Sequence, residues 1–121
     1  MDDQLKPLFS TISLVCVLFL SVGLLGVGML KLMSYPDVVT LFESWGFPAW
    51  SRYVIGVCEL MLAILLLYRP FWIPVSIAII FLMTGAIAIH AIHGQTSFIY
   101  GPITVFILSS TLFFSAWVQK K

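Results

Sequence analysis

The chain has 121 residues, of which 61% are hydrophobic and only 9% are charged, and its formal net charge is +1. A soluble domain carries about 25% charged residues, and a small domain buries too little of its surface to hide so much apolar material. These numbers exclude a soluble enzyme and a disordered chain, and they offer no basic surface for a nucleic acid. The composition therefore predicts one integral membrane domain, with the lipid bilayer as a partner.

The first apolar segment lies between Lys6 and Lys31, and no residue between these two lysines is charged. A membrane-spanning helix needs about 20 predominantly apolar residues. We therefore predict a first transmembrane helix over residues 8–30. The acidic residues Asp2 and Asp3 and the length of the apolar stretch favour a retained helix over a cleaved signal peptide.

The next segment is too polar to span a bilayer and is predicted to form a short amphipathic helix over residues 36–45. Pro36 suits the first turn of a helix, and Gly46 suits the position just after its end. Its apolar side chains fall on one stripe: Val38, Leu41, Phe42 and Trp45. Two interpretations remain open. We favour a connector anchored at the outer membrane interface, and the alternative is a lid over the outer end of the helices.

Three further apolar segments complete the chain. The predicted transmembrane helices cover residues 49–68, 71–93 and 99–118. Arg69 and Pro70 separate the first two of these helices, and the polar, turn-prone run 93–97 separates the last two. The predicted fold class is all-α: an integral membrane four-helix bundle in a single domain, residues 1–121, with the amphipathic interfacial helix between helices 1 and 2.

The Lys and Arg residues near the ends of these segments predict the orientation of the chain. Four of them are expected on one side of the membrane: Lys6, Arg69, Lys120 and Lys121. Lys31 and Arg52 are expected on the other side. Because loops rich in Lys and Arg stay in the cytoplasm, we predict a multi-pass membrane protein with both termini cytoplasmic. The membrane is expected to be a bacterial inner membrane.

Glu59 is the most informative residue, because it is a carboxylate within an apolar helix. Such a group costs about 2.5–3.5 kcal/mol on insertion scales and usually faces a partner inside the protein. Helical side chains lean toward the N-terminus of their own helix, so Lys31 and Glu59 lean toward each other in antiparallel neighbours. We predict a Lys31–Glu59 ion pair. The alternatives are a lysine that reaches the interface alone and a protonated carboxyl group bonded to backbone.

Two histidines near the end of the third helix add to the candidate site. His90 and His93 are three residues apart and share one helix face. The other candidates for a polar pocket in the outer half of the bundle are Lys31, Glu59, Tyr100 and Thr104. Structural or interfacial histidines are the alternative. No metal is predicted, because no third strong ligand stands at a diagnostic spacing.

The two cysteines are predicted not to pair. Cys16 and Cys58 fall at different depths of antiparallel helices, so their Cα atoms are too far apart for a disulfide. We expect both to be small, buried, apolar residues.

A set of short motifs runs along nearly the whole chain, over about residues 10–115. They are Gly28-Met29-Leu30-Lys31-Leu32, Trp45-Gly46-Phe47-Pro48, Ile55-Gly56-Val57-Cys58-Glu59-Leu60, Arg69-Pro70, Met83-Thr84-Gly85-Ala86 and His90. This set resembles the DoxX-like family of small four-helix membrane proteins. The resemblance implies a four-helix bundle in which Lys31 and Glu59 are signature positions.

The family and its relatives include a thiosulfate:quinone oxidoreductase subunit, a component of an oxidative-stress complex, proteins of methylamine-dehydrogenase maturation and an animal receptor-assembly chaperone. The resemblance therefore implies fold more than function. Our first hypothesis for the function is a non-catalytic assembly factor or scaffold for a membrane complex.

The second hypothesis is a redox-linked subunit with a redox protein partner, which binds a quinone or similar apolar molecule in the outer pocket. Lys31 or His90 would bond a carbonyl and Glu59 would exchange a proton. The third is a small proton or solute carrier, which requires a homo-oligomer. No cofactor beyond a bound quinone or lipid is expected, and enzymatic activity stays an open question.

Overall fold

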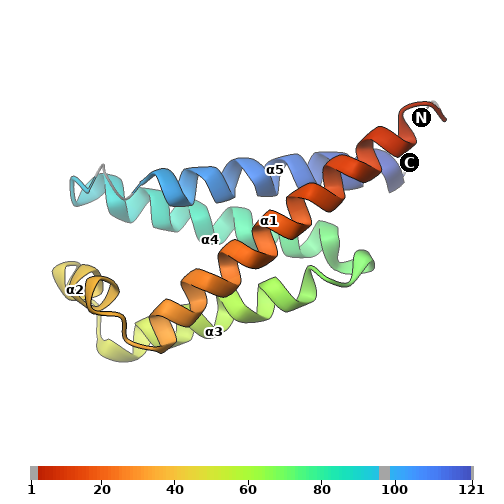
Figure 1. Cartoon of the computed structure of the whole chain (residues 1–121). Helices are drawn as coiled ribbons and strands as arrows, with labels where there is room; N and C mark the ends of the chain where they lie inside the picture. The colour runs from red at the N-terminus through yellow and green to blue at the C-terminus, as the bar shows by residue number, and fades with distance from the viewer. Residues whose placement is uncertain (1–2, 96–98, 121) are drawn as a thin grey trace.

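The fold was analysed in a computed structural model, which describes residues 3–95 and 99–120 (Figure 1). Within these residues the structure is all-helical and contains no strand, which confirms the predicted all-α class. The elements in chain order are α1 (Lys6–Leu32), α2 (Pro36–Ser44), α3 (Ala49–Leu65), the 3-10 helix η1 (Arg69–Phe71), α4 (Trp72–Ile92) and α5 (Tyr100–Lys120).

Three helical segments are long and apolar enough to cross a membrane. They are α1, the continuous stretch of η1 and α4, and α5. Helices α2 and α3 meet the same criterion only together, and they are bent by 119° at the break between them. The described part of the chain thus has three candidate spans, or four if the bent pair is one span. The protein is an integral membrane protein.

Helix α3 ends at Leu65, earlier than residue 68 of the predicted helix 49–68. The cause is Pro70, which has no N–H to offer the carbonyl group of Leu66 four residues before it. That carbonyl accepts instead a 2.8 Å hydrogen bond from the indole Nε1 of Trp72. Leu66 and Trp72 are both buried, so this bond gives a partner to a carbonyl group that burial would otherwise leave without one.

Helix α1 packs along both α3 and α5, and α4 packs along α5. In Figure 1, α1 and α5 lie side by side near the two termini and diverge toward the end where α2 lies. The buried core lies between these helices and includes Leu20 and Leu24 of α1, Ile79 of α4 and Leu112 of α5. Large apolar side chains cover the outside, as expected for a surface in contact with lipid.

The two cysteines do not share an environment. Both are free, and Cys16 is buried as expected. Cys58 is exposed on the outer surface of α3, so the expectation that it is buried was wrong. The inward face of α3 is formed by Arg52, Gly56 and Glu59 at helical spacing, and Cys58 is rotated away from that face.

Candidate functional site

The centre of the candidate site is an ion pair between α1 and α3. The two helices approach closely at Gly28 and Gly56, where a Cβ atom on Gly28 would lie 2.9 Å from the Gly56 carbonyl oxygen. Lys31 and Glu59 each follow one of these glycines by three residues. The Lys31 Nζ atom lies 2.7 Å from the Glu59 Oε1 atom, and the Glu59 side chain is only 4% exposed. The structure therefore brings together two residues of the candidate set.

Arg52 holds the end of α1 above this pair. Its Nε atom donates a 3.0 Å hydrogen bond to the Lys31 carbonyl oxygen, and its Nη2 atom donates a 2.8 Å bond to Ser34 Oγ. The last carbonyl groups of a helix lack partners within that helix, and a cation can satisfy them. In the sequence, Arg52 entered only the count of Lys and Arg residues that predicts orientation. Its burial against the end of α1 depends on the packing of α1 on α3, so no local pattern indicated this second role.

His90 is buried near the end of α4, and its Nδ1 atom has no hydrogen-bond partner among the described residues. The ring of Trp45 packs edge-on against the His90 ring, with 5.2 Å between centroids. Trp45 Nε1 in turn donates a 2.7 Å hydrogen bond to Gln95 Oε1. These contacts attach the end of α2 to the end of α4 above His90.

Lys31, Glu59 and His90 all line one cavity of about 370 Å³. Its wall receives residues from α1, α2, α3, α4 and α5, and most of them are apolar. Among the described lining residues, Lys31, Glu59 and His90 are the ones with ionisable side chains. An apolar cavity with a few converging polar groups is the usual form of a small-molecule site.

Helix α2 covers one end of this cavity. The four residues of its apolar stripe all line it: Val38, Leu41, Phe42 and Trp45. The burial of Phe42 and the contacts of Trp45 show that this stripe faces the protein. That position agrees with the lid interpretation, in which the amphipathic segment closes the mouth of a site.

Other candidate residues lie outside the cavity lining. His93 is exposed, and its Nδ1 atom is 2.9 Å from the Ile89 carbonyl oxygen. Tyr100 is 70% exposed at the start of α5. Thr104 is exposed and donates a hydrogen bond to the Tyr100 carbonyl oxygen. The residues of α5 that line the cavity are instead Gly101, Pro102 and Val105. The face of α5 that borders the cavity is therefore an apolar wall without a hydroxyl group.

Within residues 3–95 and 99–120, no three His, Cys, Asp or Glu side chains are grouped closely enough to hold a metal ion. The ionisable groups that line the cavity are an ammonium group, a carboxylate and an imidazole.

The sequence model of the DoxX-like family matches residues 13–112, a range that contains every residue lining the cavity. The chain belongs to the DoxX-like family. No curated protein and no solved structure matches it significantly. Membership agrees with the apolar helices in identifying a membrane protein, but a fold shared by a family does not assign an activity. In this DoxX-like protein, the cavity lined by Lys31, Glu59 and His90 is the feature that bears on function.

Proposed function

We propose that this protein binds a small, largely apolar molecule with hydrogen-bonding oxygen atoms, of the quinone class, in the cavity beneath α2. The observation that carries the proposal is that His90 lines this cavity together with Lys31 and Glu59, while its buried Nδ1 atom has no hydrogen-bond partner among the described residues. A buried polar atom without a partner costs about 1–3 kcal/mol. A ligand oxygen that bonds it would remove this cost.

The size and the walls of the cavity support a ligand of about one substituted ring. Its volume of about 370 Å³ lies near the lower end of the range of about 300–1,000 Å³ found for ligand sites. Apolar side chains such as Leu82 and Val105 line it and suit the faces of a ring. The three ionisable side chains reach it from three different helices, so they can meet more than one oxygen of the ligand.

The three polar side chains suit both forms of a quinone. A carbonyl oxygen accepts a hydrogen bond from the Lys31 ammonium group or from a protonated His90 ring. A hydroxyl group donates to the Glu59 carboxylate or to a neutral His90 ring. We propose binding only; electron transfer would require a redox partner. The scaffold hypothesis is the alternative, and a scaffold needs no ligand in this cavity.

We also propose that α3 is the fourth membrane span and that α2 lies at the outer interface of a bacterial inner membrane. Helix α3 has 17 residues, which equals the lower limit of the range of about 17–25 for a span. The sharp bend of 119° allows α2 to lie across the end of the bundle while α3 crosses the bilayer. Both termini would then lie on one side of the membrane, and the Lys and Arg count favours the cytoplasm for that side.

The test uses the intact protein in neutral detergent and a benzoquinone that lacks the isoprenoid tail. Thermal unfolding and tryptophan fluorescence are measured during titration, because Trp45 lines the cavity. Bound ligand at a hundredfold excess over its Kd should stabilise the protein by about 2.7 kcal/mol. The shift should disappear in His90→Ala and in Glu59→Gln.

His93→Ala is the matched control, because His93 is three residues further along and lies outside the cavity lining. This variant should keep the quinone-induced shift. His90→Gln serves as a second variant if His90→Ala does not fold, and circular dichroism reports the helix content of each. Equal shifts in all proteins would show that the quinone only enters the micelle, and the scaffold hypothesis would then be preferred.

A further inference from the structure

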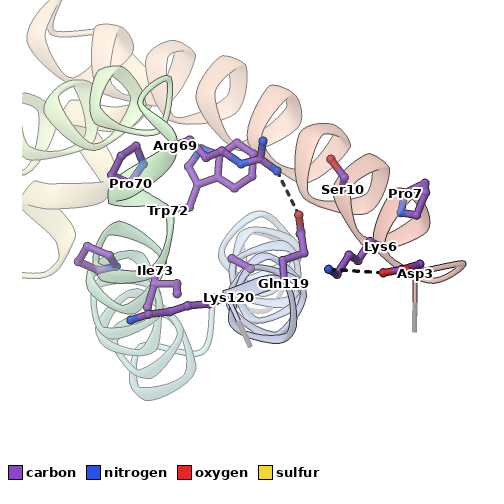
Figure 2. A pocket seen from close by; sticks show the side chains of 12 residues that line it. Asp3, Lys6, Pro7, Ser10, Arg69, Pro70, Trp72, Ile73, Gln119 and Lys120 are labelled. Atoms are coloured by element: carbon purple, nitrogen blue, oxygen red, sulfur yellow. Dashed lines mark hydrogen bonds and ion pairs between the residues drawn. The ribbon is translucent and has the colours of Figure 1, made fainter. Parts of the chain in front are cut away.

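A second, larger cavity of about 800 Å³ lies at the opposite end of the molecule, beside the described ends of the chain (Figure 2). It is separate from the site beneath α2 and shares no lining residue with it. Three basic residues line it, and each comes from a different part of the chain: Lys6 of α1, Arg69 of η1 and Lys120 of α5. Asp3 is the acidic residue among the described lining residues. The cavity thus has three positive charges against one negative charge.

Arg69 is held in position from two sides. Its guanidinium carbon lies 5.0 Å from the centre of the Trp72 ring, and its Nη2 atom donates a 3.1 Å hydrogen bond to Gln119 Oε1. Figure 2 shows Arg69 extending over Trp72 toward Gln119. Gln119 is itself bonded through Nε2 to Phe9 and Ser13 of α1. The guanidinium group is therefore oriented by contacts to two helices, and among residues 3–95 and 99–120 its other N–H groups make no hydrogen bond.

The two lysines are held more loosely. Lys6 Nζ lies 3.6 Å from Asp3 Oδ1, and the two side chains are 56% and 95% exposed. An exposed ion pair of this kind contributes little to stability, so a stronger anion can replace the carboxylate. Lys120 Nζ lies 5.8 Å from the centre of the Trp117 ring. Lys6 and Lys120 can therefore turn toward an anion held by Arg69.

The rest of the lining is mostly apolar, with Ser10 and Gln119 as its polar residues, and most of it belongs to α1, α4 and α5. Ile73 follows Trp72 at the start of α4, and Ala116 lies on α5 one turn before Lys120. A ligand that fits this cavity has a negatively charged group beside the three basic residues and an apolar part that lies along the helices. Basic pockets between transmembrane helices bind the headgroups of anionic lipids in this way.

We propose that this cavity binds the phosphate group of an anionic phospholipid. Arg69 takes the phosphate with two parallel hydrogen bonds, since its planar group matches a phosphate. Lys6 and Lys120 add charge from either side. A free phosphate offers the same charged group, but it leaves the apolar part of the cavity empty. The proposal is independent of the quinone site and of the side on which the termini lie.

Native mass spectrometry of the intact protein in neutral detergent tests the proposal. Phosphatidylglycerol and phosphatidylcholine with identical acyl chains are compared, so that the headgroup is the only difference. We expect the wild type to prefer phosphatidylglycerol at least tenfold. Each basic residue near a membrane surface contributes about fivefold to such binding. The triple variant Lys6→Gln/Arg69→Gln/Lys120→Gln should lose the preference.

Asp3→Asn gives a change in the opposite direction. It removes the carboxylate that pairs with Lys6, so it should strengthen the binding of phosphatidylglycerol. Arg69→Lys keeps the charge but loses the planar group and should bind less tightly than the wild type. Equal binding of both lipids by the wild type, or an unchanged preference in a folded triple variant, would overturn the proposal. Displacement of the lipid by glycerol phosphate or inorganic phosphate at equal concentration would assign the site to a soluble phosphate instead.

Discussion

Gly28 of α1 and Gly56 of α3 are in direct backbone contact. A Cβ atom on Gly28 would lie 2.9 Å from the Gly56 carbonyl oxygen, and one on Gly56 would lie 3.1 Å from the Gly28 carbonyl oxygen. Lys31 also crowds this position, because a Cβ atom on Gly56 would lie 3.1 Å from the Lys31 Cβ atom. Small residues let membrane helices approach this closely. The contact sets the distance at which Lys31 and Glu59 meet.

Gly28→Ala should destabilise the protein, because its new methyl group would collide with a backbone atom that cannot rotate away. Overpacking of this kind costs about 1–3 kcal/mol. Gly26→Ala is the control, since a Cβ atom at Gly26 has no atom within 4 Å. Thermal unfolding followed by circular dichroism in detergent should show a lower midpoint for Gly28→Ala only. Equal midpoints for the two variants would contradict the close approach of α1 and α3.

The Lys31–Glu59 pair predicts a non-additive double-mutant cycle. Glu59→Leu leaves Lys31 without its partner, and Lys31→Met leaves Glu59 without its own, at a cost of about 3–5 kcal/mol for a buried pair. Replacement of both residues by apolar ones should cost less than the sum of the single changes. The free energy of unfolding of all four proteins measures the difference. Additive effects would show that the two side chains do not interact.

Much of the fold could be predicted from charge and proline positions. Long stretches without charged residues predict apolar helices, and the structure has the long apolar helices α1, α4 and α5 in those stretches. The early end of α3 was also within reach of the sequence. Pro70 cannot donate to the Leu66 carbonyl group, and the nearby indole of Trp72 takes that role.

The candidate site was only partly predictable. Glu59 and Lys31 could be paired because helix direction determines where side chains lean. The bond from Trp45 to Gln95 joins residues 50 positions apart, and it depends on the bend between α2 and α3. Gly46 and Pro48 mark the break in the sequence, but no local pattern specifies its angle. The cavity lining on α5 was equally hard to predict. Gly101 and Pro102 line the cavity instead of Tyr100 because of how α5 packs against the other helices, and the sequence alone does not specify that packing.

The topology can be tested with a protease. We predict cytoplasmic termini because Lys6, Arg69, Lys120 and Lys121 outnumber Lys31 and Arg52. A C-terminal tag should survive when protease is added to the outer face of sealed spheroplasts and should be removed after lysis. A tag that is lost before lysis would reverse the orientation and would place the quinone cavity in the cytoplasmic half.

The last prediction concerns a variant that fills the quinone cavity without removing any polar group. Gly23 lines the cavity, and a Cβ atom there would have no atom within 4 Å. Gly23→Leu should therefore keep the fold, since leucine also favours a helix over glycine by up to about 1 kcal/mol. Its side chain would occupy the space proposed for the ligand. The melting temperature of this variant should not respond to the tail-less quinone.

Gly26→Leu is the control for this filling variant, because Gly26 is equally open but is not part of the cavity lining. Both variants add the same side chain to α1, so they change the apolar surface and the detergent contact alike. A quinone-induced shift in Gly26→Leu but not in Gly23→Leu would locate the ligand beside Lys31 and Glu59. If both variants kept the shift, the quinone would bind elsewhere. If both variants lost the shift, the quinone would bind to the outer surface of α1 instead of the cavity, and the proposed site would be wrong.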